Sequence, residues 1–283
     1  MEKIILLAET GSDIPAETAR QYGIYIVPMH VSFGGETLDD GTFSSEEIVD
    51  YYKRTGKLPK TSGSVPEDFM KIFDRIHEEH PDSQILYLAY SAVTTCSYQS
   101  AQIAMEGRDY VTGIDTKQVA AGQYAVVITM AKLLERHPEW GIEEAREMAE
   151  KVSRSVSMCF VPDTLEFLHA GGRVSNAAAL CGALLKIHPR IEIQDGYLQA
   201  TKKHRGSMKK IVPQLVKDYI AEKSLDTEEM WLIHAPGLDQ AIMNQAEEAA
   251  RSCGMKKVTW VKTGGVITTH GGPGAFGVVG VMK

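Results

Sequence analysis

Cysteine is scarce in this chain of 283 residues, and the few cysteines form no metal-ligand motif. The four are isolated from one another, with no Cys-x-x-Cys spacing: Cys96, Cys159, Cys181 and Cys253. This usage favours reduced thiols over a disulfide framework and offers no zinc site. The carboxylates Asp13, Asp39, Asp40 and Asp115 also lack the spacing of metal ligands. We therefore expect a cytoplasmic protein that holds no metal ion.

Long apolar runs and an excess of positive charge are absent as well. No apolar run approaches the roughly 20 residues of a membrane helix. The apolar run after Lys3 has five residues, which is short for a signal peptide and typical of a first strand. The formal net charge is −7 and the pI is about 5.7, which argues against nucleic-acid binding through a basic face.

The common phosphate and nucleophile motifs are also missing. The chain contains no GxxxxGK[ST] loop, no GxGxxG before a helix and no GxSxG elbow. We therefore expect no nucleotide site of the ordinary kinds and no serine nucleophile on a strand-to-helix elbow.

In the first 150 residues, apolar runs typical of strands alternate with stretches typical of helices. Strands are expected at residues 3–7, 24–31, 85–90 and 110–114. This alternation predicts a parallel sheet with right-handed crossovers, in which ligands collect at the carboxyl ends of the strands. We also expect Asp13 to cap a helix over Pro15–Tyr22.

The pattern changes in the second half of the chain. A short strand is expected over Cys159–Pro162, and a helix rich in small residues over Ala177–Lys186. Asp195-Gly196 between two apolar runs is a strong hairpin signal. The sequence therefore predicts an α/β protein of two domains. Residues 1–150 form an N-terminal Rossmann-like domain with a parallel sheet, and residues 151–283 form a C-terminal domain with a mixed sheet.

Two loops rich in hydroxyl groups occur in the first half. In Leu86–Ala101 (LYLAYSAVTTCSYQSA), an apolar run ends at hydroxyl residues that include Ser91 and Thr95, just before a helix. The first N–H groups of a helix lack acceptors, so this arrangement suits an anion. Thr61 and Ser62 form the second loop. An ordinary N-cap and a solvated loop explain the same residues.

Three basic residues stand next to glycines or a strand end. His270 is followed by Gly271 and Gly272, which let the backbone approach another group closely, so the imidazole can donate to a carboxylate or act as a base. Arg173 follows a Gly-Gly turn and Arg205 a strand, and both suit phosphate binding. A glycine-rich turn with an incidental histidine and a solvated basic face are the alternatives.

Several separated motifs together resemble the DegV family of bacterial fatty-acid-binding proteins, the lipid-carrying partners of fatty acid kinase. The resemblance runs over nearly the whole chain, and it depends on the joint order and spacing of these motifs. They are Thr10-Gly11-Ser12-Asp13-Ile14-Pro15, Lys60-Thr61-Ser62, Ser97-Tyr98-Gln99-Ser100-Ala101, Gly171-Gly172-Arg173-Val174, Lys203-His204-Arg205 and His270-Gly271-Gly272-Pro273-Gly274.

The resemblance implies two α/β domains, with a long-chain fatty acid buried in the second and its carboxyl group held by hydroxyls of the first. The residues that match the carboxylate site of the family are Thr61, Ser62, Ser91, Thr95 and His270. Arg173 and Arg205 match basic residues implicated in kinase docking or acyl-phosphate handling. This chain has Ala92 and Cys96 where the family has Ser and Gly, so which hydroxyl of residues 91–97 holds the headgroup stays open.

The walls of the acyl site are expected among apolar residues of the second half, although core packing explains most of them equally well. The candidates are Phe160, Leu165, Phe167, Leu168, Leu180, Leu184 and Phe276.

The leading hypothesis is a carrier that is not itself an enzyme and uses no cofactor. It binds a long-chain fatty acid and presents the carboxyl group to a separate fatty acid kinase subunit, with a possible transient membrane contact and no nucleic acid. One alternative is an acyl hydrolase or transferase with Ser91 or Thr95 as nucleophile and His270 as base. Another is a binder of sugar- or dihydroxyacetone-type molecules that shares only the fold.

Overall fold

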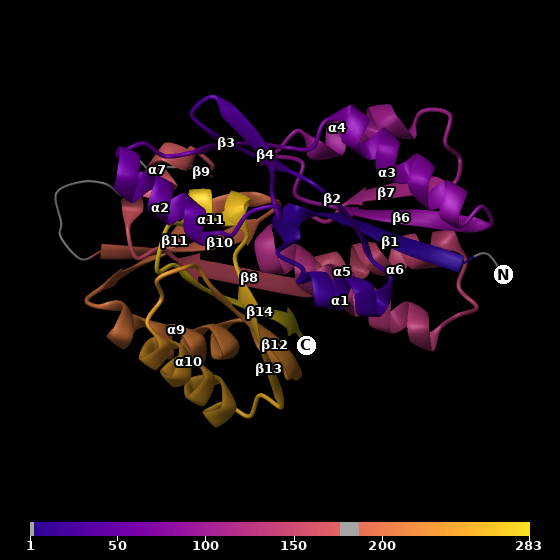
Figure 1. The fold of residues 1–283 in the computed structure, drawn as a ribbon. Helices are drawn as coiled ribbons and strands as arrows, with labels where there is room; N and C mark the ends of the chain where they lie inside the picture. The colour runs from indigo at the N-terminus through magenta and orange to yellow at the C-terminus, as the bar shows by residue number, and fades with distance from the viewer. Residues whose placement is uncertain (1–2, 176–186) are drawn as a thin grey trace.

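The computed structural model describes residues 3–175 and 187–283. Its first part is built on a parallel sheet, here called sheet A, with the strand order β2-β1-β6-β7 (Figure 1). The four strands are β1 (Lys3–Glu9), β2 (Tyr25–Val27), β6 (Ser83–Ala89) and β7 (Val111–Asp115). Five helices accompany this sheet: α1 (Ala16–Tyr22), α3 (Pro66–Glu79), α4 (Ser97–Met105), α5 (Ala120–Arg136) and α6 (Ile142–Ser155).

Both faces of sheet A are buried, because side chains alternate along each strand. On β1, Ile5 and Leu7 join the core beneath α3 and α4. Leu6 and Ala8 join the core that contains α5. This two-sided burial explains why β1 and β6 read as unbroken apolar runs in the sequence.

A small antiparallel sheet, sheet B, covers one end of the first part. It contains β3 (His30–Phe33), β4 (Glu36–Asp39) and β5 (Lys60–Ser62), and α2 (Glu46–Thr55) follows β4. The single strand expected over residues 24–31 was wrong. The chain leaves sheet A after Val27, passes through Pro28, and enters sheet B at His30. Proline lacks an N–H donor, so it suits this break between two sheets.

The second part is built on a mixed sheet of seven strands, sheet C, in the order β13-β12-β14-β8-β10-β11-β9. The strands are β8 (Val156–Val161), β9 (Val174–Ser175), β10 (Ile187–Gln194), β11 (Tyr197–Arg205), β12 (Leu225–His234), β13 (Lys257–Lys262) and β14 (Phe276–Met282). The hairpin expected at Asp195-Gly196 is confirmed, because β10 and β11 pair antiparallel around it. The helix expected over Ala177–Lys186 lies outside the described residues.

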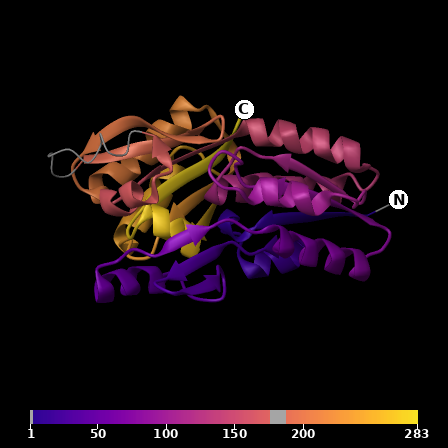
Figure 2. The same cartoon turned by 90° about the horizontal axis from the view of Figure 1, so that it is seen from above.

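Helices cover both faces of sheet C (Figures 1 and 2). One face packs on α9 (Met208–Glu222) and α10 (Gln240–Ser252). The shorter helices α7 (Leu165–Gly171) and α11 (Gly265–Gly271) lie on the other side, toward sheet B. The predicted α/β fold with a parallel and a mixed sheet is therefore confirmed.

Helix α5 lies between the two large sheets. Its core cluster contains Leu86 and Leu88 from sheet A, and Trp231, Ile233 and Val279 from sheet C. The chain passes from the first part to the second between Ser155 and Val156, where α6 ends and β8 begins. The division at residue 150 stays a prediction, and α6 runs across that position.

Candidate ligand-binding site

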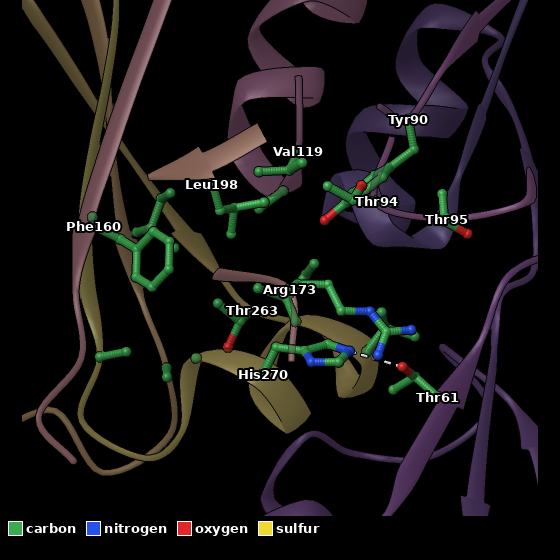
Figure 3. Close-up of a pocket in the computed structure, with 18 of the residues that line it drawn as sticks. Thr61, Tyr90, Thr94, Thr95, Val119, Phe160, Arg173, Leu198, Thr263 and His270 are labelled. Carbon is green, nitrogen blue, oxygen red and sulfur yellow. Dashed lines mark hydrogen bonds between the residues drawn. The ribbon is translucent and has the colours of Figure 1, made fainter. Parts of the chain in front are cut away.

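A cavity lies between sheet C, the first residues of α5, and α11. Its empty space is about 860 Å³, including the part that opens to solvent. Most of its lining is apolar, and polar side chains gather at one end (Figure 3).

The apolar wall comes from alternate residues of sheet C and from the start of α5. Met158 and Phe160 are two residues apart on β8, so they point to the same side of the sheet. Ile233 on β12 and Leu198 on β11 extend this surface, and Val119 adds to it from the start of α5 (Figure 3). The regular alternation of the strands makes this wall a continuous apolar surface.

The polar end brings together segments that are far apart in the sequence. Thr61 comes from β5, Thr94 and Thr95 from the loop after β6, and His270 from the last turn of α11. Thr61 Oγ1 and His270 Nε2 are 2.8 Å apart, although the residues are 209 positions apart in the chain (Figure 3). Ser62 and Arg173 also line this part of the cavity.

His270 is neutral at neutral pH. Burial and, to a smaller extent, the nearby charge of Arg173 lower its pKa from 6.5 to about 4. Its Nδ1 atom is buried and has no hydrogen-bond partner among the described residues. A buried N–H group without an acceptor costs more free energy than a buried lone pair without a donor. We therefore assign the proton to Nε2, which donates to Thr61 Oγ1. The hydroxyl hydrogen of Thr61 is then available to a ligand oxygen.

Two glycines allow the close approaches at this polar end. A Cβ atom on Gly171 would lie 2.4 Å from His270 Nδ1. A Cβ atom on Gly63 would lie 2.4 Å from Thr95 Oγ1. Any side chain at either position would have to displace a group of the site, so these two positions require glycine.

The N-terminus of α11 is held by two carboxylates from the first domain. Asp13 Oδ1 accepts from the Gly264 N–H at 2.7 Å, and Asp40 Oδ1 accepts from the Gly265 N–H at 2.8 Å. The expected capping of α1 by Asp13 was wrong, because Pro15 is the N-cap residue of that helix and offers no side-chain bond. Asp13 caps a helix of the other domain instead.

Ser91, expected at the carboxylate site, lies outside the cavity lining. Its buried hydroxyl donates to the Gly196 carbonyl at 2.9 Å and so joins the loop after β6 to the β10–β11 hairpin. Arg205 is exposed at the end of β11, and it does not line the cavity.

Of the seven candidate wall residues, Phe160 and Phe276 line the cavity, and the ring of Phe276 also packs near Trp260. Three others are placed elsewhere: Leu165 borders a separate surface hollow, Phe167 packs in a core with Met29 and Val266, and Leu168 packs in a cluster with Phe160. Leu180 and Leu184 lie outside the described residues.

Several cavity residues were not singled out from the sequence. They are chiefly Met29, Tyr90, Val119, Met158, Leu198, Ile233 and Thr263. Strand alternation from Phe160 would have identified Met158, and Tyr90 directly follows a strand whose carboxyl end faces the site. The others carry no local signal, because any buried apolar residue fits their pattern.

Within residues 3–175 and 187–283, no group of three or more His, Cys, Asp or Glu side chains is arranged to hold a metal ion. None of the helices in that part of the chain combines the length and apolar content that a bilayer crossing requires.

The fold and the cavity define a two-domain α/β protein with a mostly apolar cavity that has polar side chains at one end. Comparison with known proteins specifies this class further. The family profile described as "Uncharacterised protein, DegV family" matches residues 3–283, so the chain belongs to the DegV family.

Similar proteins include a DegV domain-containing protein of Caldanaerobacter subterraneus subsp. tengcongensis, which is 29% identical over 285 residues and 98% of each chain. A protein of Thermotoga maritima named fatty acid-binding protein is 26% identical, over 97% of this chain and 96% of its own. The solved structure of a DegV family protein from Thermus thermophilus, described for its fatty acid binding, superimposes with a TM-score of 0.88. That match has 26% identity and covers 99% of this chain and 100% of the other.

Proposed function

We propose that this protein binds a long-chain fatty acid in the cavity between sheet C and α5. The observation that carries the proposal is the hydrogen-bonded pair of Thr61 and His270 at the end of a mostly apolar cavity. In this arrangement Thr61, Ser62, Thr95 and His270 surround the carboxyl group. The acyl chain of the ligand lies along the wall that contains Phe160.

The energetics of burial suit this ligand. A chain of roughly 16 to 18 carbons gains about 12 kcal/mol gross on full burial, at ~0.8 kcal/mol per CH₂. That gain exceeds typical immobilisation costs, so tight capture is expected. The carboxyl group must keep its hydrogen bonds, because an unpaired buried carboxylate is very costly. Neutral donors at the polar end, together with the nearby charge of Arg173, meet this requirement.

Two relatives support the proposal by their descriptions. The Thermotoga maritima relative is named a fatty acid-binding protein, and the Thermus thermophilus structure is described as a fatty-acid-binding DegV protein. Both align over nearly the whole of this chain. We infer the same ligand class here because the matched region includes both the polar end and the apolar wall.

We further propose that the carrier presents the carboxyl group to a separate kinase, in the cytoplasm and with at most transient membrane contact. A cluster of cations near the end of β11 supports an anionic partner or product. Lys203, Arg205, Lys209 and Lys210 are exposed, and within the described residues none of them has an ion pair. Arg173 lines the cavity, and its planar guanidinium suits phosphate oxygens, which supports a role with an acyl phosphate.

The geometry of the site does not support the alternative of an acyl hydrolase or transferase. His270 Nε2 contacts Thr61, whereas Ser91 Oγ donates to Gly196 and Thr95 Oγ1 lies 3.1 Å from Ser97 Oγ. Neither expected nucleophile is therefore paired with the expected base, which is the arrangement that such catalysis requires.

The test is mass spectrometry of ligands extracted from the purified protein. We expect one fatty acid per chain, displaced by added long-chain fatty acid and not by a sugar phosphate. Recovery of no fatty acid, together with no binding of added palmitate in calorimetry, would count against the proposal. The kinase step is tested separately, by adding the kinase and ATP to the loaded protein and following acyl-phosphate formation.

A further inference from the structure

The side chain of His30 lies between two carboxylates that come from different elements. Its Nδ1 atom is 2.9 Å from Asp39 Oδ1, and its Nε2 atom is 2.9 Å from Asp68 Oδ2. His30 stands on β3, Asp39 on β4 and Asp68 in the first turn of α3. The side chains of His30 and Asp68 are 14% and 16% exposed, so the contact between them is largely shielded from water.

Both contacts require a hydrogen atom between the nitrogen and the oxygen. A carboxylate oxygen only accepts hydrogen bonds, and a neutral imidazole carries a single N–H group. A neutral His30 would therefore direct a lone pair at one of the two carboxylates from 2.9 Å. A protonated carboxyl group would also satisfy this geometry, but imidazole is a stronger base than a carboxylate. The arrangement therefore favours the imidazolium form of His30, which donates to both carboxylates.

The surroundings of His30 supply negative charge. Within residues 3–175 and 187–283, neither Asp39 nor Asp68 forms an ion pair with a lysine or an arginine. The other charged residues of β4, β5 and the first two turns of α3 are exposed, and their described contacts do not include His30: Glu36, Lys60, Glu67 and Lys71. The two carboxylates that it contacts thus compensate the charge of the imidazolium.

The bridge between His30 and Asp68 spans the turn that leads from β5 to α3. The oxygen of Asp68 that contacts His30 also accepts the Val65 N–H at 2.9 Å. In the pairing of β3 with β5, His30 lies opposite Ser62, the last residue of β5. The bridge therefore fixes both ends of residues 63–65.

This turn and β5 contact the polar end of the cavity. Gly63 in the turn faces Thr95, because a Cβ atom on Gly63 would lie 2.4 Å from Thr95 Oγ1. On β5, the hydroxyl of Thr61 is 2.8 Å from His270 Nε2. A displacement of β5 relative to α3 would therefore disturb the hydroxyl groups that line this end.

We propose that His30 is an imidazolium that acts as a positioning residue, whose bridge to Asp68 holds β5 on α3 and so keeps the polar end of the cavity in place. The unfolded chain offers no such pair of acceptors, so the native state holds this proton more tightly. Stability contributed by the bridge is therefore lost as the pH rises. The effect on ligand binding rests on the proposed function, whereas the protonation of His30 and its effect on stability do not.

Two substitutions separate the charge of this bridge from its shape. His30→Gln keeps an amide that donates to one carboxylate, but it carries no charge and does not titrate. Asp68→Asn keeps an oxygen for the Val65 N–H and removes the negative charge that faces Nε2. His137→Gln is the matched control, because His137 contacts a single carboxylate, that of Glu139, and does not line the cavity.

The protonation state is read from NMR spectra of the ring nitrogens in the ligand-free, ¹⁵N-labelled chain. The spectrum of His30→Gln identifies the signals of His30. At pH 7.5 we expect hydrogen on both ring nitrogens of His30 in the native chain, and on only one of them in Asp68→Asn. A neutral His30 in the native chain at this pH would overturn the proposal.

Melting temperatures of the ligand-free proteins between pH 6 and pH 8.5 test the effect on stability. Relative to the native chain, we expect His30→Gln and Asp68→Asn to melt about 2–4 °C lower at pH 6 and nearly equally at pH 8.5. His137→Gln should follow the native profile. Glu9, whose pKa is raised to about 7 by burial, titrates in the same range but contributes equally to every variant. A difference that stays constant with pH would indicate a purely structural role and overturn the proposal.

The coupling to the cavity is read from the dissociation rate of cis-parinaric acid, a fluorescent fatty acid, over the same pH range. We expect release from the native chain to accelerate several-fold as the pH rises, and release from His30→Gln to be fast at every pH. Equal pH dependence in both proteins would overturn the coupling to the polar end. If the native chain binds no fatty acid at all, the proposed function fails, while the NMR spectra and melting profiles still decide whether His30 is an imidazolium.

Discussion

The two ends of the cavity are built in different ways. The apolar wall is carried mostly by strands of sheet C, where Met158 and Phe160 face inward because alternate residues of a strand share a side. The polar end is assembled at segment ends from both domains, with Thr61, Thr95 and His270 as its core. The wall is therefore as rigid as the sheet, whereas the polar end depends on how the two domains meet.

This difference assigns different parts of recognition to the two ends. The wall offers only contact area, so under the proposed function it selects for the length and shape of the acyl chain. The polar end offers donors at fixed places, so under the proposed function it distinguishes a carboxylate from other headgroups. Substitutions at the two ends should consequently change different properties of binding.

The largest effect is expected at the polar end. His270→Ala removes the imidazole and leaves Thr61 without its partner, so palmitate affinity should fall by about 10- to 100-fold, the equivalent of ~1.5–3 kcal/mol for a hydrogen bond to a charged group. Affinity for the corresponding fatty alcohol should fall much less. Competition against cis-parinaric acid measures both affinities. The control is His137→Ala, because this partly exposed histidine lies beside Trp140 and does not line the cavity. Equal losses of affinity for the acid and the alcohol would show that the polar end does not recognise the carboxylate.

A smaller effect is expected at the wall. Phe160→Ala removes ring contacts with the chain, so palmitate affinity should fall about 10-fold, or ~1.4 kcal/mol. Here the acid and the alcohol should lose affinity equally, and the preferred chain length should change. Titration with a series of fatty acids from 12 to 20 carbons, about 0.8 kcal/mol per CH₂, gives this preference. An unchanged length preference would show that the acyl chain does not lie against Phe160.

Ser91 and Thr95 test which hydroxyl of the loop after β6 contacts the ligand. Ser91→Ala leaves the Gly196 carbonyl without its donor, so it should cost about 1–3 kcal/mol in unfolding free energy and little in palmitate affinity. Thr95→Val should lower palmitate affinity and change the unfolding free energy little, since Thr95 lines the cavity. Urea unfolding and competition binding separate the two effects, and a headgroup role for Ser91 would appear as a loss of affinity at unchanged stability.

The smallest effect concerns the protonation of His270. The unfolded chain takes up a proton near pH 6.5, whereas burial keeps the native imidazole neutral down to about pH 4. Stability contributed by the neutral imidazole is therefore lost as the pH falls from 6.5 toward 4. His270→Gln keeps a donor for Thr61 and cannot titrate, so its melting temperature should fall less than that of the native chain between pH 7 and pH 5. Parallel curves would contradict a buried neutral histidine.

The sequence was informative wherever structure follows from neighbouring residues. The hairpin at Asp195-Gly196 and the buried strands around residues 3–9 and 83–89 have strong local patterns, and both were predicted. Asp13 shows the opposite case. Its position before Pro15 suggests a local cap, but its partner Gly264 lies 251 residues away. Local capping rules cannot anticipate such a contact, because it exists only after the domains meet.

The candidate site shows the same division. Thr61 and His270 were expected together only through the family resemblance, since no pattern links residues 209 positions apart. Leu165 and Phe167 are apolar and close in sequence to the site, yet neither lines the cavity. Leu165 borders a surface hollow, and Phe167 packs in a core with Met29 and Val266. An apolar residue on a short helix can face several directions, whereas Phe160 on a strand could only face one of two.

The placement of α5 has a consequence for handling this protein in the laboratory. Eleven of its 17 residues are buried, and its side chains pack against both large sheets. Either half expressed as a fragment would expose one side of this contact as an apolar surface, and such a fragment should aggregate. The intact chain should therefore unfold in a single calorimetric peak, and a proteolytic nick at residues 137–141 should leave two pieces that stay associated until denaturant is added.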